Sequence, residues 1–173
     1  VIASNIPFGT FGLYDKDFAQ SDKTHQMAMK TIHNYFFIKA LDLLNEGGIL
    51  AFVTTRGIAD TQGNKFVREY LVQHANLISA LRLPDNLFMQ TGGIEVGSDL
   101  LVFQKNSRKS GRSHREELFL QTFKETDCEG HTTEPSNKLF SLPNTALDTS
   151  SSIRMNQYGK YVRKYLWQGT QKS

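Results

Sequence analysis

Two stretches of this sequence place chemically capable side chains where a predicted strand stops. In the first, Ser4-Asn5-Ile6-Pro7-Phe8-Gly9, an amide and an aromatic ring follow the short apolar run 1–3. In the second, Thr54-Thr55-Arg56 follows the apolar run 49–53. An Asn side chain donates and accepts hydrogen bonds, and ligands of α/β sheets bind beyond the carboxyl ends of the strands. Asn, Pro and Gly are also the common residues of turns, so a ligand-binding site and a plain turn both stay open at this point.

The composition excludes several classes of protein. The 173 residues suit one domain, or one domain with an appendage, and 39% hydrophobic with 11% aromatic residues can build a core. The net charge of +3 is compatible with nucleic-acid binding without demanding it. A single cysteine, Cys128, excludes an internal disulfide, and with no Cys/His spacing of the zinc kind we expect no metal site. No apolar run reaches the ~18 residues of a membrane span and no signal peptide is visible, so we expect a cytoplasmic protein without membrane contact.

The pattern of apolar residues predicts an α/β fold. Four strands are expected, at 1–4, 49–55, 77–83 and 99–104, the first two of them buried parallel strands. Apolar residues spaced by three and four predict a helix over 25–46 that Gly47 and Gly48 end, and a second helix over 64–74. Residues 9–24 are polar and rich in glycine, which favours a loop.

The order of these elements predicts the sheet. Strand, helix, strand, helix, strand is the pattern of a parallel sheet with right-handed crossovers. The 13 residues between the last two strands, 85–97, contain no helical pattern, so we expect those strands to pair antiparallel. The core is then expected within residues 1–105. The run 105–115 has five Lys or Arg and no acid, which favours a solvated flexible linker over a contact with DNA phosphates.

In this order the elements resemble those of the DNA adenine-N6 methyltransferases. Those enzymes carry Asn-Pro-Pro-Phe or Asn-Pro-Pro-Tyr after the fourth strand of a Rossmann-like sheet, and this chain has Asn-Ile-Pro-Phe at residues 5–8. The next helix and strand, HNYFFIKALDLLNEGGILAFVTTRG, are similar to those of bacterial methylases of the type I restriction-modification and mobile-element kind. SALRLPDNLF and GSDLLVFQK look like the sixth and seventh strands of that family. The likeness covers about residues 1–105.

The resemblance implies a partial Rossmann-like methyltransferase sheet with flanking helices, in which the strands are equivalent to the fourth to seventh and the last is antiparallel. Residues 1–105 would be the C-terminal half of an S-adenosylmethionine-dependent catalytic domain, and 106–173 a basic linker and tail of uncertain fold. The family binds S-adenosylmethionine mainly through a glycine-rich turn and an acidic residue upstream of the catalytic motif. Nothing here matches them, so we expect the cofactor-binding residues outside this sequence and the isolated chain to be inactive.

The same resemblance assigns roles to the first stretch. The exocyclic amine of adenine is a poor nucleophile, because its lone pair is delocalised into the ring. The Asn5 side-chain oxygen and the Ile6 carbonyl would accept hydrogen bonds from the two N–H groups of this amine and so free its lone pair. Phe8 would stack on a base flipped out of the duplex, Pro7 would fix the turn, and Gly9 would let the backbone come close. Ile6 stands where the family usually has its first proline, and the loss of a fixed φ lowers preorganisation.

Further candidates follow from position. Thr55 and Arg56 are candidates for substrate binding because they end a strand, and a structural role is equally open. His33 lies on a predicted helix beside aromatic residues, which favours a core or edge histidine over a catalytic one. DNA and the N-terminal half of the catalytic domain are the partners that the resemblance implies. The edge of strand 1–4 would lack its ladder partner, so self-association is also expected.

Two other functions stay open. A methyltransferase of the same fold could act on an RNA base or on protein glutamine. Alternatively, the chain could be a degenerate, non-catalytic nucleic-acid-binding module in which Ile6 is a symptom of lost catalysis. An intact Gly-x-Gly turn upstream would favour an enzyme, and substrate preference would separate the two kinds of enzyme. The main expectation is a piece of a bacterial DNA adenine-N6 methyltransferase.

Overall fold

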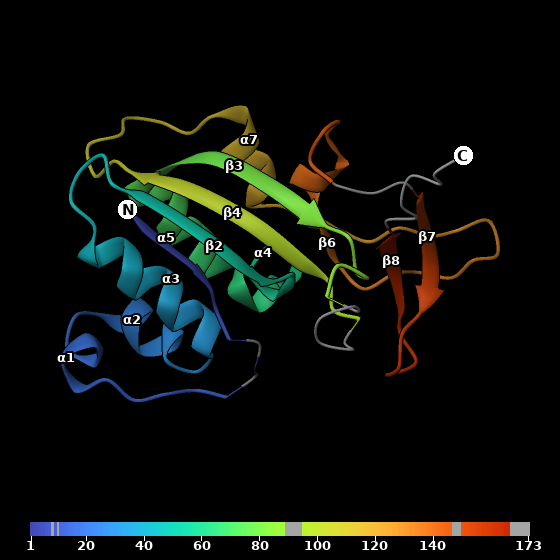
Figure 1. Cartoon of the computed structure of the whole chain (residues 1–173), viewed down its shortest axis with the longest axis horizontal. Coiled ribbons are helices and arrows are strands. Elements are labelled where there is room, and N and C mark those ends of the chain that lie inside the picture. Colours follow the sequence, from blue (N-terminus) through green and yellow to red (C-terminus); the bar gives the residue numbers. More distant parts are fainter. Residues whose placement is uncertain (8, 10, 89–94, 147–149, 167–173) are drawn as a thin grey trace.

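The computed structural model describes residues 1–7, 9, 11–88, 95–146 and 150–166 of the chain. Its centre is a mixed sheet in the order β1-β2-β4-β3 (Figure 1). The strands are β1 (Ile2–Asn5), β2 (Ile49–Thr55), β3 (Ala75–Leu83) and β4 (Ser98–Lys105). β1 pairs parallel with β2, and β4 lies antiparallel between β2 and β3. All four predicted strands, and the antiparallel pairing of the last two, are confirmed.

The register of the sheet aligns the two stretches of chemical interest. Asn5 is opposite Val53 in the parallel pair of β1 and β2, so the carboxyl ends of both strands lie at the same edge. Thr55 is opposite Ser98, where the antiparallel strand β4 begins. The polar residues that follow β1 and β2 are therefore neighbours in space, although some fifty positions separate them in the sequence.

The helices differ in part from the prediction. The described helices are α1 (Lys16–Ala19), α2 (Lys23–Ala28), α3 (Ile32–Leu43), α4 (Gly57–Asp60), α5 (Lys65–His74) and α7 (His114–Phe119), with 3₁₀ turns η1 (Gln62–Asn64) and η2 (Lys138–Ser141). The prediction for 64–74 is confirmed by α5. The single helix expected over 25–46 is wrong, because the chain breaks between α2 and α3 and the second helix stops at Leu43.

The loop expected over 9–24 is also wrong in part, since it contains α1 and the start of α2. Both short helices begin at an aspartate whose carboxylate caps the first turn: Asp15 accepts from the backbone N–H of Phe18, and Asp22 from that of His25. Such caps satisfy backbone donors that a helix start leaves free. Gly47 has a φ of 76° and serves the turn before β2, several residues after the helix has ended.

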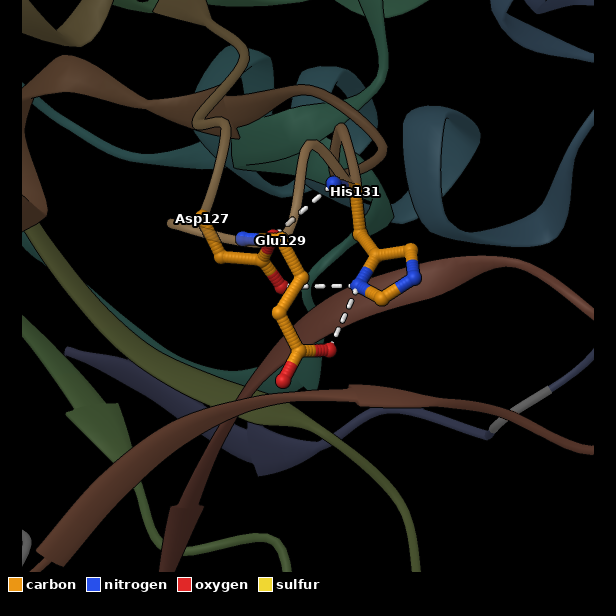
Figure 2. Close-up of side chains that lie close together, drawn as sticks. All are labelled: Asp127, Glu129 and His131. Atoms are coloured by element: carbon orange, nitrogen blue, oxygen red, sulfur yellow. Dashed lines mark hydrogen bonds and ion pairs between the residues drawn. The ribbon is translucent and has the colours of Figure 1, made fainter.

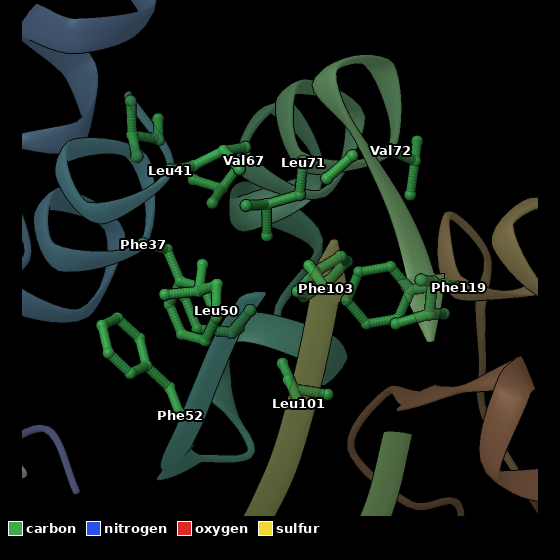
Figure 3. Packing of buried hydrophobic residues seen from close by; sticks show 14 of the residues in the cluster. Phe37, Leu41, Leu50, Phe52, Val67, Leu71, Val72, Leu101, Phe103 and Phe119 are labelled. Carbon is green, nitrogen blue, oxygen red and sulfur yellow. The ribbon is translucent and has the colours of Figure 1, made fainter. Parts of the chain in front are cut away.

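The hydrophobic core lies between the sheet and helices α3 and α5 (Figure 3). The ring of Phe37 on α3 packs edge-on against that of Phe52, with centroids 5.2 Å apart. Along β2 only alternate residues are buried, so the expectation that both faces of this strand are buried is wrong in this structure. β1 is mostly exposed as well, and among the described residues it has a ladder partner on one side only.

The core does not end at residue 105, where the sequence analysis placed its limit. Phe119 on α7 packs on Phe103 of β4 with ring centroids 5.9 Å apart, and Leu139 and Phe140 belong to the same cluster. The rest of the tail forms two small antiparallel pairs, β5 (Thr122–Phe123) with β6 (Ser136–Asn137), and β7 (Ser150–Met155) with β8 (Tyr161–Leu166).

The basic run 105–115 is not simply solvated. Lys109 Nζ lies 2.7 Å from Glu116 Oε1 and 3.0 Å from the carbonyl of Ala75, and both charged side chains are largely buried. Ser113 and Glu116 form a capping box at the start of α7. That Ser-x-x-Glu signal was visible in the sequence and predicts a helix start at this point.

None of the helices in the described ranges combines the length and apolar character needed to cross a membrane.

Candidate active site

The first stretch lies at the carboxyl end of β1. Asn5 is the last residue of the strand, and its side chain is exposed, as is that of Pro7. Ile6 is 2% exposed and belongs to the hydrophobic core. Phe8 lies outside the described residues. The amide of Asn5 is therefore open to a ligand, while the next residue anchors the stretch in the protein.

Ile6 makes a contact that proline could not make. Its backbone N–H donates to the carbonyl of Val53 on β2, with 3.1 Å between nitrogen and oxygen. Proline has no N–H and would leave this carbonyl without that donor. The fixed φ that the sequence analysis considered lost is thus replaced by a hydrogen bond to β2 and by burial of the isoleucine side chain.

His33 on α3 lies beside the same stretch. Its Nε2 is 3.5 Å from the backbone nitrogen of Gly9, and its Nδ1 is 3.5 Å from the hydroxyl oxygen of Thr54. Burial lowers the pKa of His33 below its ordinary value of 6.5, which favours the neutral ring. The histidine is half-buried, in agreement with an edge histidine, but both its nitrogens face the candidate site.

Arg56, expected to bind substrate, is engaged within the protein. Its guanidinium pairs with the buried carboxylate of Asp85 and donates to the Arg163 carbonyl at 3.0 Å. It also lies over the ring of Tyr165, 5.0 Å from the centroid. Burial raises the pKa of Asp85 against the opposing effect of Arg56. These contacts support the structural role that the sequence analysis left open for Arg56.

Thr55 lines a cleft of about 1000 Å³ between the carboxyl edge of the sheet and the hairpin of β7 and β8. The hairpin contributes Met155 and Tyr158, which are 56% and 76% exposed. This wall was not predictable from the sequence pattern, because the tail was expected only as a segment of uncertain fold. Residues far apart in the sequence thus form a cleft at the edge where ligands of α/β sheets bind.

A second, smaller groove of about 300 Å³ runs between β1 and α3. Most of its wall is apolar, from Ile2, Ile6, Phe36, Ala40, Leu43 and Phe52. The polar groups of Tyr35 and Lys39 in this wall are both bonded to Asp15. The residues that line the groove include no acid and no glycine-rich turn, so they do not fit the ribose and amino-acid groups of S-adenosylmethionine.

A buried arginine is the main charged feature that the sequence analysis missed. Arg82 on β3 is 1% exposed, pairs with Asp99 on β4 at 2.9 Å and with Asp60 at 2.8 Å, and lies 4.0 Å from the ring centroid of Phe140. Burial opposes its charge, but the two carboxylates hold its pKa well above the ordinary value. The sequence offered a signal for this pair, because Arg82 and Asp99 carry opposite charges in strands that are mainly apolar. Through these contacts the network joins β3 and β4 of the sheet to η2.

Asp127, Glu129 and His131 form the group of possible metal ligands in the described part of the chain (Figure 2). Asp127 Oδ1 accepts the backbone N–H groups of Glu129 at 2.9 Å and His131 at 2.8 Å, and Oδ2 is 3.0 Å from His131 Nδ1. The backbone hydrogen bond from His131 is the main reason that the pKa of Asp127 is low. These contacts make a turn, and the His131 ring stacks on that of Tyr161.

The chain belongs to the N-6 DNA methylase family, whose profile matches residues 1–140. Among solved structures it is similar to a type I restriction enzyme modification subunit from Vibrio vulnificus, with 17% identity, a TM-score of 0.52, and coverage of 99% of this chain and 38% of that one. It is also similar to a class I S-adenosylmethionine-dependent methyltransferase of Listeria monocytogenes, with 17% identity, a TM-score of 0.50, and coverage of 65% and 33%.

These likenesses show the fold. The sheet is a partial Rossmann-like methyltransferase sheet, as expected, and the chain spans 33% and 38% of the lengths of these two structures. A search of curated proteins finds no match to this chain.

Proposed function

We propose that this chain is part of an enzyme that transfers a methyl group from S-adenosylmethionine to the N6 amine of adenine in DNA. The observation that carries the proposal is the position of Asn5 and Ile6 at the carboxyl end of β1, beside β2, in a chain of the N-6 DNA methylase family. The type I modification subunit and the S-adenosylmethionine-dependent methyltransferase among its structural neighbours support it.

In this proposal Asn5 and Ile6 orient the amine. The exposed Asn5 amide oxygen accepts one N–H of the target amine, and the Ile6 carbonyl accepts the other. Two acceptors in fixed positions turn the lone pair out of the ring, and their preorganisation lowers the barrier. Phe8 is assigned to stacking on the flipped base, with Pro7 and Gly9 shaping the backbone next to it.

The other candidates take supporting roles. Thr55 lines the large cleft and is assigned to the DNA side of the site. Arg56 is assigned to the wall of that cleft, since its guanidinium is engaged by Asp85. S-adenosylmethionine would be held by residues outside this sequence, in the N-terminal half of the domain. We therefore expect micromolar binding of S-adenosylmethionine to be absent when the 173-residue chain is tested alone by calorimetry.

The test is methyl transfer by the complete protein that contains this chain. Radiolabelled methyl groups are followed from S-adenosylmethionine into unmethylated DNA, and the modified base is identified by mass spectrometry after digestion. Asn5→Ala is expected to lower the rate by ~10²–10³, the usual cost of losing one positioned hydrogen-bonding group. Ser4→Ala, at the exposed neighbouring position, is the matched control and should keep the wild-type rate.

Each alternative function has its own outcome in this assay. Label in RNA or in protein glutamine, and not in DNA, would identify a methyltransferase with another substrate. Binding of DNA without any methyl transfer would identify a non-catalytic module. Wild-type methylation by Asn5→Ala would refute the assigned role of the amide.

A further inference from the structure

The described residues Ile6 and Gly9, which lie toward the two ends of the candidate stretch, are both connected to the same strand, β2. At one end, the Ile6 N–H donates to the Val53 carbonyl of β2. At the other end, the Gly9 N–H points to Nε2 of His33, whose Nδ1 faces the hydroxyl of Thr54, the next residue of β2. The first anchor is direct, and the second passes through one imidazole ring. Both anchors rest on neighbouring residues of a strand whose side chain at Thr54 is fully buried.

The partners of His33 determine where its proton must be. A backbone N–H can only donate, so Nε2 must present its lone pair to Gly9. The single proton of the neutral ring then lies on Nδ1, where the hydroxyl oxygen of Thr54 can accept it. An imidazolium would place an N–H against the N–H of Gly9 and break this arrangement. Burial of the ring lowers the pKa of His33 and so also favours the neutral ring, against a smaller opposing effect of the Gly9 backbone.

We propose that His33 is a positioning residue that, as the neutral Nδ1–H tautomer, holds the Gly9 end of the Asn5–Gly9 stretch against β2. It touches neither the amine nor the methyl donor, and acts by limiting the motion of the backbone that carries the Asn5 amide and the Ile6 carbonyl. The catalytic consequence rests on the proposed function, whereas the tautomer and the contact do not. This restraint adds to the hydrogen bond and the burial that hold Ile6 where the family usually has the rigid ring of proline.

The contacts suggest two matched variants. The amide of glutamine reaches about as far as Nε2 of histidine, so His33→Gln keeps an acceptor for the Gly9 N–H. The amide of asparagine reaches only as far as Nδ1, so His33→Asn keeps a partner for Thr54 and loses the contact with Gly9. Both variants are polar, uncharged amides at the same half-buried position, which separates the loss of the anchor from a general loss of packing.

The first experiment needs no enzymatic activity. In the ¹⁵N-labelled chain at pH 7, the imidazole nitrogen shifts of His33 are expected to show a protonated Nδ1 and an unprotonated Nε2. The Gly9 amide is expected to exchange with solvent faster in His33→Asn, by about 10-fold or more, than in the wild type or His33→Gln. The opposite tautomer at pH 7, or equal exchange of Gly9 in all three proteins, would overturn the inference.

The second experiment measures methyl transfer by the complete protein. His33→Asn is expected to lower kcat by on the order of 10- to 100-fold with little change in the KM for DNA, and His33→Gln to restore most of it. If Asn5→Ala is inactive while His33→Asn keeps the wild-type kcat, the positioning role is wrong and the proposed function stands. If Asn5→Ala has no effect, the proposed function is wrong, and the tautomer and the exchange of Gly9 alone decide whether His33 is an anchor.

Discussion

Replacing Ile6 with proline, the residue usual in the family, is expected to destabilise this chain. The Ile6 side chain is 2% exposed, and truncating such a residue to alanine costs about 2–5 kcal/mol. Proline also removes the N–H that donates to Val53 at 3.1 Å, and a carbonyl left without its donor costs about 1–3 kcal/mol more. The rigid ring stabilises through the unfolded state by only about 0.4–1 kcal/mol. The unfavourable effects are therefore larger.

The three variants Ile6→Val, Ile6→Ala and Ile6→Pro separate these contributions. Urea unfolding of the chain, followed by circular dichroism, compares midpoints at a constant slope m. Ile6→Val should lose about 0.5–1.5 kcal/mol, as a small truncation does. Ile6→Ala should lose more and Ile6→Pro at least as much as Ile6→Ala. If Ile6→Pro is as stable as the wild type, then the hydrogen bond to Val53 contributes nothing and the explanation given for isoleucine here is wrong.

Three further predictions concern the rest of the chain. Burial of His25 disfavours its charge, but hydrogen bonds to Asp22 and Asp42 raise its pKa above 6.5. The stabilisation from these bonds is therefore complete below about pH 6.5 and is lost as the pH rises through the raised pKa. Unfolding midpoints at pH 6 and pH 9 should differ more in the wild type than in His25→Asn. Arg82→Met should cost about 3–5 kcal/mol in urea unfolding, because it leaves the buried carboxylate of Asp99 and the partly buried carboxylate of Asp60 without their cation. An unchanged midpoint would contradict this. The exposed edge of β1 should make the chain self-associate. Light scattering that reports only the mass of a monomer at high protein concentration would disprove this.

The strands and α5 could be predicted because their signals are local. The apolar runs of β2 and β4 are bounded by turn residues, and the helical spacing in α5 is continuous. The break between α2 and α3 could not be predicted in this way, since apolar residues continue through it. It is stabilised by hydrogen bonds to the preceding loop, from Ile32 N–H to the Phe11 carbonyl and from Leu13 N–H to the Met29 carbonyl. These contacts join residues that periodicity does not relate.

The same distinction between local signals and distant contacts applies to the candidate site. The position of Asn5 at a strand end could be predicted from the residues around it, and so could the exposure of that edge to ligands. The role of His33 could not, because its partners Gly9 and Thr54 are 24 and 21 positions away. Arg56 was expected to face a substrate because of its place after β2, yet it pairs with a carboxylate 29 positions later, at Asp85. The end of a predicted strand indicates where a residue lies, whereas the direction of its side chain depends on partners that are distant in the sequence.

The contacts of Asp85 also bear on the division of the chain at residue 105. Its carboxylate accepts the backbone N–H of Tyr165 at 3.0 Å, and its own N–H donates to the Tyr165 carbonyl at 2.7 Å. β8 is thereby attached to the carboxyl edge of the sheet, and the hairpin of β7 and β8 becomes one wall of the cleft that Thr55 lines. A chain cut after residue 105 would keep Asn5 and Ile6 but lose that wall. In the proposed enzyme the tail therefore shapes the DNA side of the site.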